Sequence, residues 1–123
     1  MNKRIKRGQI YRATLDDTVG SEQSGTRPVI IIQANSFNKT SPTVIVAAIT
    51  SQAKKRLDLP THVIVRCYNL PKDSIVLTEQ VRTLDKSRLT EYIGRASVNT
   101  MKRVDFAIDI IAKEKRKHYK TYK

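Results

Sequence analysis

The sequence of 123 residues has a single cysteine, Cys67, so it cannot form an internal disulfide. Stability must therefore come from a packed core, and a chain of this length can bury one within a single domain. A lone free thiol fits a reducing compartment. We therefore expect one cytoplasmic domain.

Long apolar runs are missing as well. No stretch approaches the roughly 20 apolar residues that a membrane helix needs. The basic residues 1–7 are not followed by an apolar segment, which is unlike a secretory signal. We expect neither a membrane span nor an export signal.

Acidic residues are scarce. The chain has 11 Asp and Glu against 24 Lys and Arg, which gives a net charge of +13. Such an excess favours a polyanionic partner, such as nucleic acid, an acidic protein or an anionic membrane. Part of it lies in residues 113–123, which we expect to form a basic C-terminal tail. The rest lies in residues 1–112, the expected domain, so a basic binding face is predicted.

Motifs for several kinds of chemistry are absent from the sequence. His62, His118 and Cys67 are isolated and lack the spacing of metal ligands, so we expect no metal and no cofactor. Neither a Gly-x-Ser-x-Gly nucleophile motif nor a P-loop is present. His62 is better explained as a structural histidine than as a catalytic one, because a general base needs a partner that the sequence does not identify.

Six segments have the alternation or apolar character of strands, and they precede one helix. The third is apolar on both faces and should be central. Two turn-rich segments, residues 35–42 and 84–89, are each expected to hold a short helical turn. Six short strands and a helix predict a mainly β fold, as a small barrel or strongly curved sheet. The predicted strands cover residues 9–15, 29–33, 43–50, 61–66, 74–83 and 92–96.

The C-terminal helix has two apolar stripes. Ser97 or Asn99 is expected to cap its N-terminus. Phe106 and Ile110 form a stripe to the side of the main one, and a lone barrel would leave them exposed. We therefore expect a homodimer. The main stripe consists of Met101, Val104, Ile108 and Ile111, with Ala107 beside it.

Residues 20–28 form a polar loop that leads into a buried strand. Gly20 and Gly25 allow the loop to fold tightly, and Pro28 suits the first residue of the strand. Arg27 is then held at a rim, where its planar fork of donors suits a phosphate. The alternative is a surface arginine beside an ordinary hairpin loop.

Polar residues follow or interrupt three of the strands, and in a small barrel they can meet at one end. Arginine and hydroxyl groups suit the stabilisation of a charged phosphorane, and they suit simple phosphate binding equally well. Glu22 is a candidate general base, or it makes a hydrogen bond within its loop. Residues 54–56 form a basic cluster nearby in the sequence. The three polar groups are Ser21, Glu22 and Gln23 with Arg27; Thr50, Ser51 and Gln52; and Glu79 and Gln80 with Arg82.

Four segments resemble, in order, the MazF/PemK toxins of bacterial toxin–antitoxin pairs. The resemblance covers most of the chain, from Arg7 to about Ile111. It implies a barrel of the MazF/CcdB type, related to SH3-like barrels, with a C-terminal helix. It also implies a homodimer whose groove binds single-stranded RNA, and a cognate acidic antitoxin. The four segments are residues 20–29, 41–50, 59–63 and 73–86.

The resemblance also implies roles for individual residues. The catalytic arginine and threonine of the family fall on Arg27 and Thr50. Ser24 stands where many members have a second glycine, and the basic tail is longer than the family pattern needs. The family's substrate-contacting positions fall on Ser21, Glu22, Gln23, Ser51 and Gln52.

The activity that the resemblance implies is a sequence-specific, ribosome-independent endoribonuclease, or mRNA interferase, that uses no metal. The RNA 2′-OH attacks the adjacent phosphate and leaves a 2′,3′-cyclic phosphate and a 5′-OH. An alternative is a CcdB-like toxin that binds a protein target such as gyrase without cutting RNA. A third hypothesis is a non-catalytic nucleic-acid binder. The presence of both Arg27 and Thr50 favours the enzyme.

Overall fold

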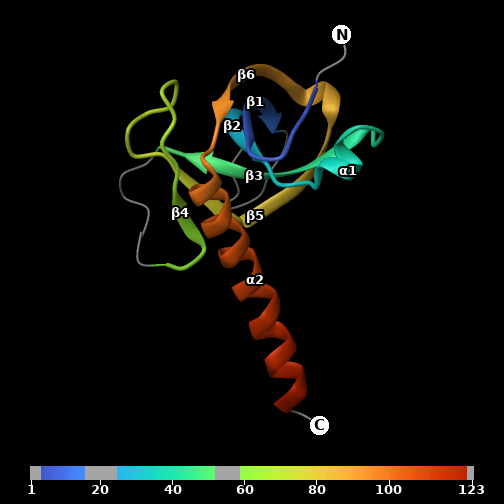
Figure 1. Ribbon diagram of the computed structural model, residues 1–123, viewed down its shortest axis with the longest axis vertical. Coiled ribbons are helices and arrows are strands. Elements are labelled where there is room, and N and C mark those ends of the chain that lie inside the picture. Colours follow the sequence, from blue (N-terminus) through green and yellow to red (C-terminus); the bar gives the residue numbers. More distant parts are fainter. Residues whose placement is uncertain (1–3, 16–24, 52–58, 122–123) are drawn as a thin grey trace.

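The computed structural model describes residues 4–15, 25–51 and 59–121, with side chains described as far as Lys113. Six strands precede a long C-terminal helix (Figure 1). The strands are β1 Gln9–Leu15, β2 Gly25–Ile31, β3 Thr43–Thr50, β4 His62–Ile64, β5 Ile75–Asp85 and β6 Leu89–Arg95. The helices are α1 Asn35–Asn38, the 3-10 turn η1 Lys86–Arg88 and α2 Val98–Thr121.

The strands form one antiparallel sheet in the order β4-β5-β3-β2-β1-β6. Register shifts interrupt the β1–β6 and β3–β5 pairs, and such bulges increase local twist. Among the described residues the two end strands, β4 and β6, do not pair with each other, so the curved sheet stays open. The predicted mainly β architecture with a C-terminal helix is confirmed.

Each face of the sheet carries a hydrophobic cluster, and β3 contributes to both. Ala47 and Ile49 pack with α2, whereas Val44 and Val46 pack on the opposite face. Side chains alternate between faces along a strand, so a segment that is apolar throughout must be covered on both sides. The bounds predicted for this strand are those observed, and it lies inside the sheet.

Helix α2 covers part of one face and then runs beyond the sheet (Figure 1). Its first turn is capped as predicted, because the Ser97 hydroxyl accepts a hydrogen bond of 3.1 Å from the Thr100 N–H. Met101, Val104 and Ala107 are buried against the sheet, where α2 packs on β4 and β5. The helix continues from the predicted domain into the predicted basic tail, and the boundary at residue 112 stays a prediction.

The start of β2 was predicted wrongly. The strand begins at Gly25, four residues before the predicted start, so Pro28 is not its first residue. Residues 25–28 join the sheet because they pair with β1, where Leu15 lies opposite Gly25. Pairing with β3 begins only at Val29, which is consistent with the missing N–H of Pro28.

Limits of the other strands except β1 and β3 differ from the prediction as well, by one to three residues, and β4 and β6 are examples. β6 begins at Leu89 rather than at residue 92, because Leu89 is already opposite Ala13 of β1. β4 is limited to three residues, shorter than the predicted 61–66. Both limits depend on the partner strand, which local alternation does not reveal.

Candidate active site

Arg27 and Thr50 come from neighbouring strands and lie at the same end of the sheet. Val29 of β2 is opposite Ala48 of β3. Continuing that register by two residues sets Arg27 opposite Thr50, a position in which Cβ atoms are typically about 5 Å apart. The alternation of each strand puts both residues on the face that α2 does not cover. The two residues that the resemblance marks as catalytic thus lie near the same end of neighbouring strands, just beyond the last observed pair, Val29 with Ala48, and their catalytic roles stay a prediction.

The two residues differ in exposure. Arg27 is exposed, whereas Thr50 is only 2% exposed and lies opposite Ile75 of β5. Ser51, the next residue along the chain, is exposed. Arg27 is thus the group that can reach a ligand directly, with Thr50 set beneath the surface.

Glu79 and Gln80 lie in a bulge of β5. Leu77 and Val81, on either side of this bulge, pair with the consecutive β3 residues Ala48 and Ala47. Arg82 lies further along, opposite Val46. Val46 precedes Thr50 by four residues, about 13 Å of strand. The β5 group therefore extends away from the Arg27–Thr50 end along the sheet.

His62 has a partner that sequence reasoning missed. Its Nε2 lies 2.9 Å from Oε2 of Glu79, and its side chain is only 5% exposed. The two residues meet because β4 and β5 form a hairpin in which His62 faces Leu77, beside the bulge. The pair ties the edge strand to the bulge, and the structural role of His62 stays a prediction.

Several predicted site residues lie outside the described part of the chain. They are Ser21, Glu22, Gln23, Gln52 and the basic residues 54–56. Whether they meet Arg27 and Thr50 stays a prediction, as does the role of Glu22 as a general base.

No group of three or more His, Cys, Asp or Glu side chains that could hold a metal ion occurs among the described residues. Within the same part of the chain, no helix is long and apolar enough to cross a membrane.

Two open cavities lie beside the sheet. One, of about 490 Å³, lies beside α1 and is lined by Arg4, Lys6 and Lys39 among others. The other, of about 550 Å³, lies between β4 and α2. We call the second one the β4–α2 groove. Neither cavity is lined by Arg27 or Thr50.

Residues 6–112 match a family model described as the PemK-like, MazF-like toxin of type II toxin–antitoxin systems. Over 108 residues the chain is 53% identical to a Staphylococcus saprophyticus protein named Endoribonuclease MazF. That match covers 86% of this chain and 89% of the relative.

Solved structures have the same fold. MazF from Deinococcus radiodurans superposes with a TM-score of 0.76 at 21% identity, over 90% of this chain and 98% of that one. A mycobacterial endoribonuclease in complex with its cognate antitoxin gives a TM-score of 0.66 at 26% identity, over 85% and 90% of the two chains. Since the family model spans most of the sequence and the sheet has the same architecture, the chain belongs to the PemK-like, MazF-like toxins of type II toxin–antitoxin systems.

Proposed function

We propose that this chain is a sequence-specific, ribosome-independent endoribonuclease that cleaves single-stranded mRNA in the cytoplasm. The observation that carries the proposal is the β2–β3 pairing, observed for Val29 with Ala48; the same register continued by two residues would set Arg27 opposite Thr50. Membership of the family and 53% identity to a protein named as an endoribonuclease support it. The same comparisons do not favour a CcdB-like toxin that leaves RNA intact.

The nucleophile of the proposed reaction is the RNA 2′-OH. Its oxygen forms a bond to the adjacent phosphorus while the bond to the 5′-oxygen breaks. The 2′-OH gives its proton to Glu22, the candidate general base, or to water, and the 5′-oxygen takes up a proton from water, which leaves a 2′,3′-cyclic phosphate and a 5′-OH. Arg27 stabilises the charge that develops on the phosphorane. Arg27 acts through its charge and its planar fork of donors. Thr50 positions the same phosphate from beneath.

The remaining predicted site residues hold the RNA on either side of the cut. They are Ser21, Glu22, Gln23, Ser51, Gln52, Glu79, Gln80 and Arg82. Base recognition in single-stranded RNA depends on hydrogen bonds to base edges and on stacking. Amide, carboxylate and hydroxyl groups in this set can make such hydrogen bonds, and Arg82 can contact a phosphate.

The proposal is tested with one RNA substrate in two forms, one of them carrying a single 2′-deoxy nucleotide 5′ of the cut. Cleavage should persist in excess EDTA and disappear with the deoxy-substituted RNA. Fragment ends should be a cyclic phosphate and a 5′-OH. DNA of the same sequence, as the control, should not be cut. Fragments that end in a plain 3′-OH, or efficient cutting of the substituted RNA, would point to activated water instead.

We also propose that the protein works as a homodimer. Ile45 is 38% exposed and Val81 is 42% exposed. They lie on adjacent strands β3 and β5, on the same face of the sheet as α2, since Val81 is opposite Ala47. A second copy of the chain would cover this apolar patch.

A cognate acidic antitoxin is the third part of the proposal. The net charge of +13 favours an acidic partner, and a disordered acidic segment can compete with RNA for a basic surface. The mycobacterial relative was solved with its antitoxin bound. Saturating antitoxin should therefore abolish cleavage and displace RNA.

A further inference from the structure

The cavity beside α1 is formed by two segments that are far apart in the sequence, and we call it the α1 cavity. Residues 4–6 form one wall, and α1 with the residue that follows it forms the other. A hydrogen bond of 2.7 Å from the Arg7 N–H to Oδ1 of Asn35 joins these walls. The volume of about 490 Å³ is in the range of small-molecule sites. The lining consists of Arg4, Ile5, Lys6, Asn35, Asn38 and Lys39.

The lining of the α1 cavity carries positive charge and no carboxylate. Arg4, Lys6 and Lys39 are exposed, and none of the three forms an ion pair within the described residues. A fourth cation lies at the wall, because Nζ of Lys86 donates a hydrogen bond to the Asn38 carbonyl. The β4–α2 groove differs, since most of its lining is apolar. Cations gathered around a concave surface concentrate positive potential there, which favours an anion.

The amide side chains of the cavity are fixed in place and leave a donor. Oδ1 of Asn35 accepts two hydrogen bonds, from the Arg7 N–H and from Nδ2 of Asn38 at 3.1 Å. This arrangement sets the amide so that the NH₂ of Asn35 remains a donor. Asn38 is 3% exposed and is held by Gln33 through hydrogen bonds of 2.9 and 3.0 Å. The cavity therefore offers donors on a rigid support, which suits the acceptor oxygens of a phosphate.

The α1 cavity is separate from the predicted catalytic end. α1 lies in the connection from β2 to β3, shortly before Thr43 begins β3. Thr50 ends the same strand seven residues later, which is about 23 Å of strand. Thr50 is opposite Ile75, which pairs with Ile64 of β4, and Figure 1 shows α1 and β4 on opposite sides of the sheet. A ligand of the α1 cavity is therefore additional to the phosphate at the cut.

We propose that the α1 cavity binds the phosphate of a nucleotide. Arg4, Lys6 and Lys39 meet the phosphate oxygens in charge-assisted hydrogen bonds. The volume leaves room for a sugar and a base, to which Asn35 donates a hydrogen bond and Ile5 adds an apolar contact. A free nucleotide and the 5′-phosphate at the end of an RNA offer this same chemistry. Such binding does not depend on the proposed cleavage reaction.

The test measures binding to the full-length chain by calorimetry, with ATP as the free nucleotide and adenosine as its control without phosphate. Lys6→Gln with Lys39→Gln removes two cations of the cavity. Lys72→Gln with Lys102→Gln removes two exposed cations that do not line it, so the two double variants have the same net charge. We expect the cavity variant to weaken ATP binding at least tenfold, the usual effect of losing a hydrogen bond between charged groups. The control should stay within about twofold, and adenosine should bind far more weakly than ATP.

A second measurement identifies the source of the phosphate. It compares two RNAs that carry a 2′-deoxy nucleotide 5′ of the cut, one with a 5′-phosphate and the other with a 5′-OH. If the cavity variant binds only the 5′-phosphorylated RNA more weakly, the end of an RNA is a ligand. If it binds ATP more weakly and both RNAs normally, the ligand is a free nucleotide. All four positions are exposed, so each variant should keep the fold, which urea unfolding checks.

Four results would overturn the proposal. Adenosine that binds as tightly as ATP would show that phosphate is not recognised. Equal losses in the two double variants would show a general effect of charge. Equal losses for the two RNAs, with ATP binding unchanged, would assign the lysines to the RNA backbone. Binding of ATP and of the 5′-phosphorylated RNA that does not depend on the cavity lysines would leave the cavity without a nucleotide. Absence of cleavage by the wild-type protein would instead contradict the proposed function, whatever the cavity binds.

Discussion

Arg27 combines a fixed backbone with an exposed side chain. Its backbone pairs with Ala13 of β1, and its guanidinium is outside both hydrophobic clusters. Replacing it therefore leaves no core cavity. We expect Arg27→Ala to lower the cleavage rate by about 10²–10³-fold, the usual effect of removing one donor aimed at developing charge. The free energy of unfolding should change by no more than about 0.5 kcal/mol, as for most surface substitutions.

The measurement pairs a cleavage assay with urea unfolding of the same preparation. Arg12→Ala serves as the control, because Arg12 lies on the adjacent strand and pairs with Glu91 at 3.2 Å. Its loss should leave cleavage within a few-fold of wild type. Near-normal cleavage by a folded Arg27→Ala variant would remove Arg27 from the mechanism.

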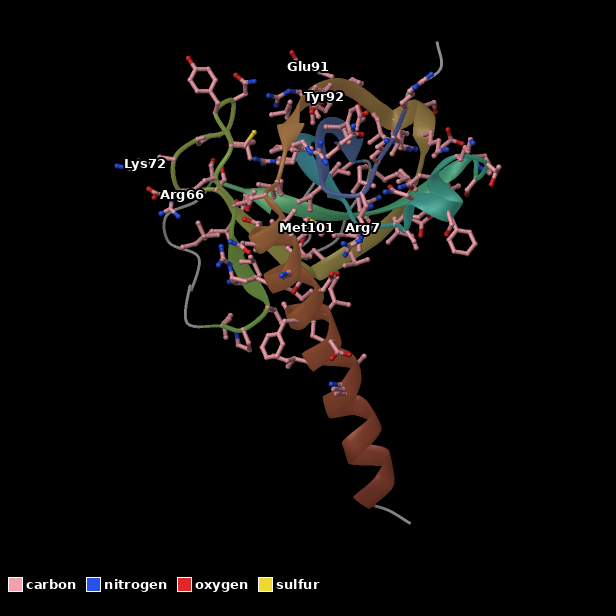
Figure 2. The ribbon with its side chains drawn as sticks, in the orientation of Figure 1. Arg7, Arg66, Lys72, Glu91, Tyr92 and Met101 are labelled. Atoms are coloured by element: carbon pink, nitrogen blue, oxygen red, sulfur yellow. The ribbon has the colours of Figure 1, made fainter. Side chains whose placement is uncertain are left out.

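Tyr11 links stability to alkaline pH. Its burial, and secondarily the neighbouring Tyr92, raise the pKa of its hydroxyl above 10.0. The two rings meet edge to face with centroids 5.5 Å apart, and Figure 2 marks the position of Tyr92. A phenol whose pKa is raised by folding contributes stability below its unfolded pKa, and this contribution is lost as the pH rises through the folded pKa.

We therefore expect the free energy of unfolding to fall above about pH 10, the pKa of an unfolded tyrosine. In Tyr11→Phe, which keeps the ring, this part of the decline should disappear. Urea unfolding of both proteins at pH 8 and pH 11 gives the comparison. Equal declines in the two proteins would show that other groups control alkaline stability.

At the scale of elements, the N-terminus of α2 depends on one side chain. The Ser97 hydroxyl accepts a hydrogen bond from the Thr100 N–H. It also donates a hydrogen bond of 3.0 Å to the Thr100 hydroxyl. Ser97→Ala should lower the free energy of unfolding by about 1 kcal/mol, the typical cost of losing a cap. Asn99→Ala is the matched control, because Asn99 lies exposed within the first turn. Denaturant unfolding that gave equal losses for both variants would contradict the assignment of the cap.

Elements with strong internal patterns were predictable from the sequence. The bounds of β3, the short helical turns and the cap of α2 follow from apolar runs, turn residues and cap residues. The early starts of β2 and β6 were not predictable, because Gly25 and Leu89 belong to strands only through pairing with β1. Pairing partners are a tertiary property that overrides local preference.

The same limit applies to the site. The resemblance singled out Arg27 and Thr50, and the observed β2–β3 pairs end two residues short of both, so their joint role stays a prediction. The His62–Glu79 pair was not found, because it depends on the register of a hairpin whose members lie 17 residues apart. The pair could have been found by treating residues 61–66 and 74–83 as the two arms of one hairpin.

At the scale of the whole molecule, we expect the wild-type protein to sediment as a dimer at micromolar concentration. Val81→Asp should yield monomers, because a carboxylate would be buried without a partner in the apolar patch with Ile45. Phe37→Asp is the control, since Phe37 is 63% exposed on α1 and outside that patch. A wild-type protein that sediments as a monomer would contradict the dimer.

The position of Arg27 outside the core has a genetic consequence. Arg27 is exposed on the face that α2 leaves open, so its loss leaves the fold and the rest of the surface in place. A chain that has lost Arg27 would stop cutting RNA and would still capture antitoxin. In a cell that makes both forms, the inactive chain would bind antitoxin, so fewer antitoxin molecules would remain to inhibit the active copies. A loss-of-function allele of this toxin would then be dominant and harmful rather than silent.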